Sequence, residues 1–259
     1  MRILATVVVA LAVVATAPAP PSTVRARVVS WNIQALSSGM DGVLATLRTL
    51  EPDVVALQEV DLRTLRSGVV DQPEALAKAL GMKARFAAAM PYEGGEYGIA
   101  LLSREELTDV EVLRLPRQLQ EEPRIAMRAQ TVIRGMPVTV INTHLAADWR
   151  VKDPPRLRRD QAHALRDWVR SPGLPTLLLG DFNCEPGSEP LGALGAVATR
   201  LSGDHKTHPT PEPTRAIDHV WHVKGAGEVR VLGSRAAMSS ASDHLPLVVD
   251  LEIRRAASK

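Results

Sequence analysis

Short apolar runs that end in polar residues recur along this chain of 259 residues. The clearest run covers residues 175–179 and is followed at once by Gly180, Asp181, Phe182 and Asn183. An uninterrupted apolar segment bounded by Pro and Gly is typical of a buried central strand, and residues two apart on a strand project to one face. A carboxylate at the edge of a core needs a metal, a proton or a cation as a partner. Asp181 is therefore a candidate site residue, with Asn183 on the same face if the strand continues that far.

The rest of the pattern predicts a layered α/β protein. Apolar residues at helical spacing predict helices over 41–50, 72–80, 155–170 and 188–197. Asp41 and Ser188 are expected to cap two of these helices, and Gly81 to end a third. Runs of apolar and β-branched residues predict strands over 24–34, 54–60, 99–103, 110–115, 124–134, 137–143, 175–183, 216–221, 228–232 and 245–253. Residues 94–98 are expected to be a flexible loop.

Two connections indicate how these strands combine. The strand, helix and strand over residues 24–60 predict a crossover unit, which joins parallel strands. The turn at residues 134–137 predicts a hairpin, which joins antiparallel strands. The sheet is therefore expected to be mixed.

The composition is ordinary for a soluble globular protein. It is 45% hydrophobic and 23% charged, with a net charge of +2, so one domain with a sizeable core is expected. This charge permits an anionic substrate but is too small for a protein that coats nucleic acid. Aromatic residues make up only 3% of the chain, which argues against base-stacking surfaces. The single cysteine, Cys184, excludes an intramolecular disulfide and is better suited to a buried filler than to a reactive thiol.

The N-terminal residues 1–22 have the pattern of an export signal. Arg2 is followed by an apolar stretch over residues 3–17, which ends in Ala-Thr-Ala and is followed by a Pro-rich spacer. A short apolar stretch after a positive start and before small residues is typical of a secretory signal peptide. We therefore expect a secreted domain over residues 23–259, or a membrane-anchored one if residues 3–17 are retained.

Acids, amides and histidines stand at the ends of several predicted strands. Strand ends of a layered α/β fold gather at one edge, where ligands bind. Carboxylates and amides together supply the hard oxygen ligands of Mg²⁺ or Mn²⁺, and the lack of cysteine pairs disfavours structural zinc. Each residue also has a structural explanation as a turn former, a cap, a buried histidine or a surface pair. The residues concerned are Asn32, Glu59, His144, Asp181, Asn183, Asp218, Asp243 and His244.

Read in order, these segments resemble the endonuclease/exonuclease/phosphatase superfamily of metal-dependent phosphohydrolases. The resemblance runs from about residue 27 to residue 253. It is carried by seven motifs: Ser30-Trp-Asn32-Ile, Asp53-Val-Val-Ala-Leu-Gln-Glu59, Tyr97-Gly-Ile-Ala-Leu-Leu-Ser-Arg104, Asn142-Thr-His144-Leu, Gly180-Asp181-Phe-Asn183, Ile217-Asp218-His-Val and Ser242-Asp243-His244-Leu-Pro.

The resemblance implies a four-layer sandwich of class α/β (α+β), in which two mixed β-sheets pack face to face with helices outside. It also implies a metal site, with Glu59, Asn32 and Asp243 holding Mg²⁺ or Mn²⁺. Tyr97 and Arg124 would contact the substrate. The cation would polarise an oxygen of the bound phosphate.

The resemblance further implies roles in the chemistry. Asp218 would orient His244, which would take a proton from the attacking water. Asp181 and Asn183 would position the phosphate and the water. His144 would stabilise the transition state or protonate the leaving oxygen.

These expectations define a secreted phosphodiesterase or phosphatase. His144 is similar to a second active-site histidine of deoxyribonucleases, sphingomyelinases and inositol phosphatases. The substrate is accordingly expected to be a lipid headgroup, a nucleic acid or a small phosphoester. A monomer without an obligate protein partner is expected. The alternatives are a non-specific secreted nuclease and a catalytically inactive binding module on the same fold.

Overall fold

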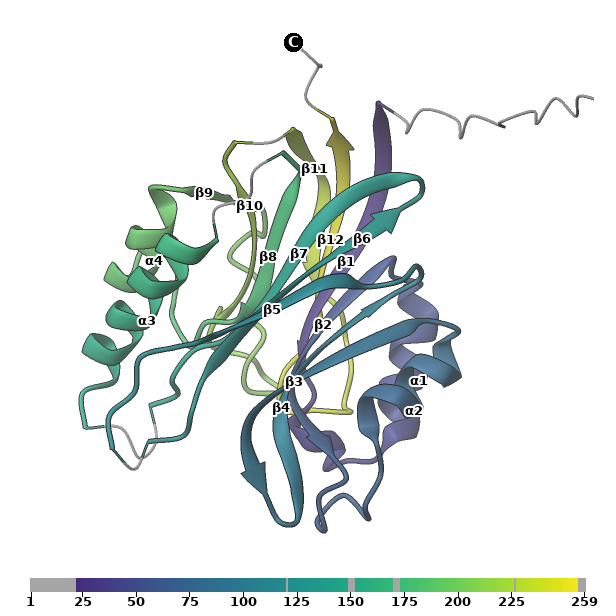
Figure 1. The fold of residues 1–259 in the computed structure, drawn as a ribbon, viewed down its shortest axis with the longest axis vertical. Helices are drawn as coiled ribbons and strands as arrows, with labels where there is room; N and C mark the ends of the chain where they lie inside the picture. Colours follow the sequence, from purple (N-terminus) through teal and green to yellow (C-terminus); the bar gives the residue numbers. More distant parts are fainter. Residues whose placement is uncertain (1–21, 120, 149–151, 170–172, 226, 256–259) are drawn as a thin grey trace, which may run out of the picture.

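The computed structural model describes residues 22–119, 121–148, 152–169, 173–225 and 227–255. Its strands form two six-stranded sheets that pack face to face (Figure 1). In order across the first sheet these are β11 (Glu228–Ala236), β12 (Leu247–Arg254), β1 (Thr23–Asn32), β2 (Val54–Leu62), β4 (Gly95–Ser103) and β3 (Lys83–Tyr92). Across the second they are β5 (Thr108–Arg114), β6 (Ile125–Ile133), β7 (Met136–His144), β8 (Thr176–Asp181), β10 (Asp218–Val223) and β9 (Ala198–Arg200).

Each sheet has one parallel pair of strands near its centre. In the first sheet β1 and β2 are parallel and are joined through a short 3-10 turn, η1 (Gln34–Leu36), and helix α1 (Met40–Leu50). In the second sheet β7 and β8 are parallel and are joined through helix α3 (Pro154–Trp168). The other neighbouring strands are antiparallel. Both sheets are therefore mixed, as the sequence predicted.

Side-chain alternation along the strands builds three apolar layers. Inward-facing residues of both sheets, such as Val28, Val140 and Leu179, form the layer between the sheets. Outward-facing residues of the first sheet pack against α1 and α2 (Gln72–Leu80). Those of the second sheet pack against α3 and α4 (Glu189–Gly195), so helices cover both outer faces (Figure 1). This arrangement confirms the predicted four-layer sandwich.

The predicted elements are found, with differences at their ends. Helix α2 matches its prediction, and Gly81 ends it with a left-handed φ of 64°. Helix α1 begins after Gly39, so the prediction of Asp41 as its cap is wrong, and Asp41 lies in the first turn. Ser188 is the N-cap residue of α4, although its side chain makes no capping hydrogen bond.

The largest error concerns residues 83–98. Residues 95–98, which were expected to belong to a flexible loop, are the first residues of β4; they follow a tight turn at residues 93–94 and pair with the unpredicted strand β3. Strand β3 escaped prediction because its central residues Ala87, Ala88 and Ala89 are alike whether buried or half-buried, so its sequence shows little alternation there.

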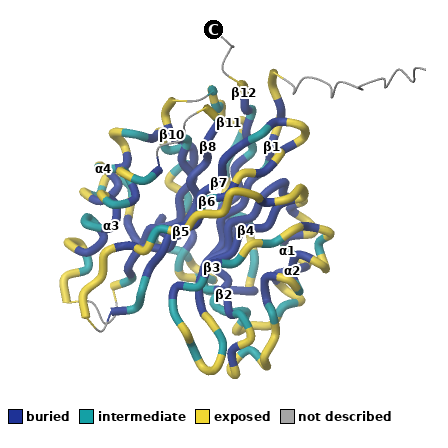
Figure 2. Tube along the Cα trace, viewed as in Figure 1, coloured by how far each residue is buried: buried dark blue, intermediate teal, exposed yellow. Residues whose placement is uncertain are grey.

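Burial is concentrated in the strands, whereas exposed residues cover the outer helix faces, the edges and the loops (Figure 2). The expected signal sequence, residues 1–22, falls almost wholly outside the described residues. Within the described part of the chain, no helix combines the length and the apolar character needed to span a membrane.

Candidate active site at one end of the two sheets

The candidate site forms where the layer between the sheets changes from apolar to polar. Along β8, Leu177 and Leu179 face the other sheet, and the same alternation turns Asp181 inward. The strand register places His144 of β7 beside Asp181, and Asp218 of β10 beside Asp181 on its other side. One row across three strands therefore carries an imidazole and two carboxylates.

Gly180 permits this row to form. A Cβ atom at Gly180 would lie 2.2 Å from the carbonyl oxygen of Thr143, which is far inside van der Waals contact. Glycine therefore allows β7 and β8 to approach closely next to the site.

His244 reaches this row from the loop before β12. Its Nδ1 lies 2.9 Å from Oδ2 of Asp218, and its Nε2 lies 3.7 Å from Oδ2 of Asp181. The hydroxyl of Thr207 donates to the same Asp218 oxygen at 2.6 Å. Trp31 donates its indole N–H to the carbonyl oxygen of His244 at 2.8 Å, which fixes the backbone of the loop. Because a carboxylate accepts hydrogen bonds, Asp218 holds the proton of His244 on Nδ1 and leaves Nε2 facing the site.

His144 is held by a hydrogen-bond donor, whereas His244 is held by an acceptor. Its Nδ1 lies 2.7 Å from Nη1 of Arg124, and both side chains are buried. A guanidinium group can only donate, so Nδ1 of His144 accepts and the proton of the neutral ring lies on Nε2. This Nε2 lies 3.5 Å from Oδ2 of Asp181. Arg124 is also ion-paired with Glu122 at 2.9 Å.

Glu59 faces the site because β2 contains a bulge. The β2–β4 register shifts between Leu57 and Val60, and Glu59 has a left-handed φ of 53°. A bulge re-aims a side chain, and a positive φ in a residue other than glycine is a strain found at functional sites. Opposite the bulge, a Cβ atom at Gly98 would lie 1.9 Å from the carbonyl oxygen of Ala87, so only glycine fits.

An amide connects the carboxylates of the two sheets. Asn32 at the end of β1 donates from Nδ2 to Oε1 of Glu59 at 2.9 Å and to Oδ2 of Asp181 at 3.2 Å. Its Oδ1 accepts from the backbone N–H of Gln34 at 3.0 Å. The side chain of Gln34 donates to Oδ2 of Asp243 at 3.0 Å. Glu59, Asp181 and Asp243 are thus joined through two amide side chains.

Burial and nearby charged groups shift the pKa values of three residues of the site. Burial, and then the neighbouring charge of Asp218, raise the pKa of Asp181 to about 7. Burial alone would lower the pKa of His244. The negative charges of Asp218, Asp181 and Asp243 outweigh this effect and raise the pKa of His244 to about 10. Burial and the positive charge of Arg124 hold the pKa of His144 well below its usual range. The two imidazoles therefore have opposite preferences, with His244 favouring the cation and His144 the neutral ring.

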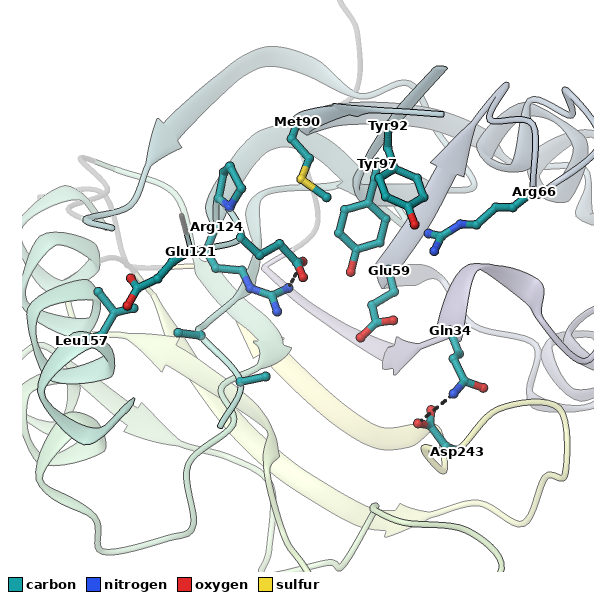
Figure 3. A pocket seen from close by; sticks show the side chains of 14 residues that line it. Gln34, Glu59, Arg66, Met90, Tyr92, Tyr97, Glu121, Arg124, Leu157 and Asp243 are labelled. Carbon is teal, nitrogen blue, oxygen red and sulfur yellow. Dashed lines mark hydrogen bonds and ion pairs between the residues drawn. The ribbon is translucent and has the colours of Figure 1, made fainter. Parts of the chain in front are cut away.

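A cavity of about 500 Å³ adjoins the site and is lined by Glu59, Asp243 and Arg124, the neighbours of these buried groups. Glu59, Asp243 and Gln34 lie on one side of it and Arg124 on the other, while Tyr97 points its hydroxyl inward (Figure 3). The structure thus places both predicted substrate contacts, Tyr97 and Arg124, in the cavity wall.

The structure brings the predicted site residues together at one end of the molecule. Asn183 contributes to the site only through other residues. Strand β8 ends at Asp181, and Asn183 follows it in a left-handed conformation with φ 49°. Its N–H donates to Oδ1 of Asp181 at 2.9 Å, and its amide donates to the carbonyl oxygen of Leu145 at 3.2 Å. Asn183 therefore braces Asp181 and the strand that carries His144.

Sequence reasoning missed three residues of the site. Gln34 follows Asn32 by two positions, a spacing that could have revealed it. His208 lies in a Pro-rich loop, with its ring 4.6 Å from that of His244 and its Nε2 3.9 Å from Oδ2 of Asp243. Arg66 lines the cavity and lies 4.4 Å from the ring centre of Tyr92. No local pattern distinguishes His208 or Arg66 from ordinary surface residues.

The donor set suits a hard divalent cation. Glu59 is partly buried and accepts a single side-chain hydrogen bond, from Asn32, and burial raises its pKa. Asp243 lies on the same side of the cavity and accepts from Gln34 and Ser242. Carboxylate and amide oxygens on one open cavity are the ligands that Mg²⁺ and Mn²⁺ prefer, and a carboxylate buried with few donors is stabilised by such a cation.

Known proteins share this architecture. The chain is 25% identical to nocturnin of Xenopus laevis over 288 residues, covering 86% of this chain and 71% of nocturnin. Human nocturnin is also 25% identical, and the chain covers 64% of its length. The solved structure of the human nocturnin catalytic domain with bound sulfate superposes with a TM-score of 0.65 and 22% identity, covering 92% of this chain and 100% of that one.

A bacterial protein has a similar fold. An endonuclease/exonuclease/phosphatase protein from Beutenbergia cavernae superposes with a TM-score of 0.70 and 22% identity, covering 89% of this chain and 72% of that one. The characteristic pattern of the Endonuclease/Exonuclease/phosphatase family matches residues 29–244, which span most of the chain and every site residue described above. The chain therefore belongs to this family of metal-dependent phosphoesterases.

Proposed function

We propose that this protein is a divalent-metal-dependent phosphoester hydrolase in which His244, oriented by Asp218, removes a proton from the attacking water. The observation that carries the proposal is the 2.9 Å contact between Nδ1 of His244 and Oδ2 of Asp218, both of which are buried. A cation bound beside His244 would add positive charge and favour its neutral ring, and the pair with Asp218 would then leave one basic nitrogen, Nε2, facing the site beside Asp181. The arrangement matches a proton acceptor whose ring is held by a second group.

Glu59, Asp243 and Asn32 would hold Mg²⁺ or Mn²⁺. When bound, the cation polarises a non-bridging oxygen of the phosphate and adds positive charge to the site. The amide of Asn32 can present its oxygen to the cavity after a half-turn, because an amide offers a donor at one end and an acceptor at the other. Glu59 and Asp243 need no such change.

The surrounding carboxylates favour the product of the proton transfer. Asp218, Asp181 and Asp243 all stabilise the imidazolium form of His244, which forms as the water loses its proton. Asp181 lies within 4 Å of both imidazoles, so it is well placed to orient the water between them. Asn183 holds Asp181 in that position.

His144 acts as a neutral hydrogen-bond donor. Arg124 holds its Nδ1 as an acceptor, so Nε2–H points into the site. Negative charge on phosphoryl oxygens grows as the reaction proceeds, and a fixed donor stabilises it. Because the pKa of His144 is well below its usual range, hydrogen bonding is a better role for it than protonation of the leaving oxygen.

The substrate class we propose is a phosphoester: a nucleic acid, a lipid headgroup or a small soluble ester. We further propose that residues 1–22 direct export, and that the mature protein works outside the cytoplasm as a monomer. The support for export is the sequence of residues 1–22 alone. Cell fractionation and the mass of the mature N-terminus test it, and a cytoplasmic protein with intact residues 1–22 would refute it.

The central experiment measures metal-dependent hydrolysis. The purified protein is assayed with Mg²⁺, Mn²⁺ or EDTA against bis-p-nitrophenyl phosphate, plasmid DNA, sphingomyelin and a phosphoinositide. His244→Ala is expected to lower kcat at least a hundredfold. His205→Ala is the matched control, because His205 hydrogen-bonds Ser234 at 2.8 Å and lines no part of the site. Unchanged turnover in His244→Ala would refute the proposed base.

The metal ligands are tested separately by binding. Glu59→Gln keeps the size of the side chain and removes its charge, so Mg²⁺ affinity by calorimetry should fall at least tenfold. Glu111→Gln, an exposed change on β5, should leave the affinity unchanged. Equal affinity of Glu59→Gln and the unaltered protein would show that the cation binds elsewhere.

A further inference from the structure

Two cavities meet beside Glu59, an expected ligand of the cation that would polarise the phosphate. The first, described above, has a volume of about 500 Å³, and a second of about 560 Å³ lies next to it. Both are lined by Gln34, Glu59 and Arg66. The second cavity continues between the segment around η1 and the loop that contains Val70. Glu59 therefore has open space on two sides.

The residues shared by the two cavities are held by hydrogen bonds. Arg66 binds the buried carboxylate of Asp61 through Nε and Nη2, at 2.7 and 2.8 Å. Gln34 donates to Asp243 at 3.0 Å and accepts from Ser37 at 2.8 Å. These contacts give the side chains between the two cavities defined positions.

The walls of the two cavities differ. The first contains the rings of Tyr92 and Tyr97, whose centres are 6.3 Å apart, together with Met90 and Leu157. Such walls suit a flat or apolar group. The second is lined mainly by small, polar and aliphatic residues of the two adjoining loops, among them Ser67.

The charges of the first cavity favour a singly charged phosphate. Both of its arginines already have acidic partners, since Arg66 binds Asp61 and Arg124 is paired with Glu122. Glu59, Glu121 and Asp243 add further carboxylates to the wall. A monoester carries close to two negative charges at neutral pH, whereas a diester carries one, so repulsion from this wall is weaker for a diester.

We propose that the substrate is a phosphodiester whose two substituents occupy the two cavities, the flatter or more apolar one lying beside Tyr92 and Tyr97. This inference rests on the proposed hydrolase activity and names the substrate class of the same site. The phosphorus of a monoester carries one organic substituent and would leave one cavity filled with water. A diester buries both substituents, and this additional contact is available to lower the barrier.

The test compares two esters that share a leaving group, bis-p-nitrophenyl phosphate and p-nitrophenyl phosphate, with Mg²⁺. We expect kcat/KM for the diester to exceed that for the monoester at least tenfold. Ala147→Trp fills the first cavity and Val70→Trp fills the second, and Val70 is already 38% exposed. Each change should lower kcat/KM for the diester at least tenfold, whereas only one of them should affect the monoester.

Leu65→Trp is the matched control. Leu65 belongs to the same loop as Val70, is 69% exposed and lines neither cavity, so both activities should be retained. A preference for the monoester that still requires His244 would overturn the diester inference and leave the hydrolase proposal standing. Full diester turnover in both tryptophan variants would also overturn the diester inference. Absence of His244-dependent turnover with both esters and with the wider substrate panel would overturn the hydrolase proposal itself.

Discussion

Replacing Arg124 by Met tests whether this guanidinium sets the protonation state of His144. The change removes the donor that lies 2.7 Å from Nδ1 of His144 and keeps most of the side-chain volume. Without this donor, Nδ1 of His144 can carry the proton itself, and the neutral ring is no longer restricted to the tautomer with its proton on Nε2. The positive charge that lowers the pKa of His144 is lost as well, so this pKa should rise, although burial still opposes protonation.

The size of the effect follows from the burial of the pair. Arg124 and His144 are 5% and 3% exposed, so the contact is poorly screened by water. A hydrogen bond to a charged group contributes about 1.5–3 kcal/mol. If this contribution is needed in the transition state, kcat should fall by about ten- to a hundredfold, because about 1.4 kcal/mol corresponds to a factor of ten. Arg124→Lys keeps a charge and a donor, and should recover part of the loss.

The decisive readout is the imidazole of His144 itself. Nitrogen-15 NMR of the ring distinguishes the two neutral tautomers and the cation, and it is independent of turnover. We expect the neutral Nε2–H tautomer from pH 6 to pH 9 in the unaltered protein, and an Nδ1–H or protonated population in Arg124→Met. An imidazolium, or a proton on Nδ1, in the unaltered protein at pH 7 would refute the reasoning.

Three further changes test the rest of the molecule. Asp218→Asn offers an amide N–H to Nδ1 of His244 and favours the wrong tautomer, so kcat should fall about a thousandfold or more at constant fold, judged by circular dichroism; a loss below tenfold would contradict the orienting role. Burial lowers the pKa of His219 to about 4, so the unfolded chain binds more protons between about pH 6.5 and 4. Stability is therefore complete above pH 6.5 and should decline by up to about 3 kcal/mol as the pH falls to 4. Urea unfolding at several pH values should show a weaker decline in His219→Gln, and parallel curves would contradict this assignment. Phe182 is fully buried against His219, with ring centres 5.6 Å apart, so Phe182→Ala should cost about 3–5 kcal/mol in the free energy of unfolding, and a cost under 1 kcal/mol would show that the core there is loosely packed.

Much of the fold could be predicted from local patterns. The run ending at Asp181 and the helix ending at Gly81 are where the sequence indicated, because apolar periodicity and turn residues act within a few positions. Strand β3 was missed, since its small residues alternate little and its place is set by pairing with β4. The same limit applies to Asp41, whose capping role depended on where α1 begins.

Much of the site could be predicted too, with the help of the family resemblance. Polar residues at strand ends were expected to gather at one edge, and the register of β7, β8 and β10 places His144, Asp181 and Asp218 in one row. His208 and Arg66 could not be predicted. They come from loops, and their proximity to the site depends on chain paths that no local pattern specifies.

The sequence by itself determined which polar residues gather at the candidate site, since strand alternation turns Asp181 and Asp218 toward the space between the sheets. Tertiary structure alone decided how those residues are tuned. A bulge with a positive φ turns Glu59 toward the cavity, Arg124 selects the tautomer of His144, and two loops divide the space beside Glu59 into two cavities. The reason is physical: alternation acts along one strand, whereas bulges, buried ion pairs and cavities arise only when distant segments pack together.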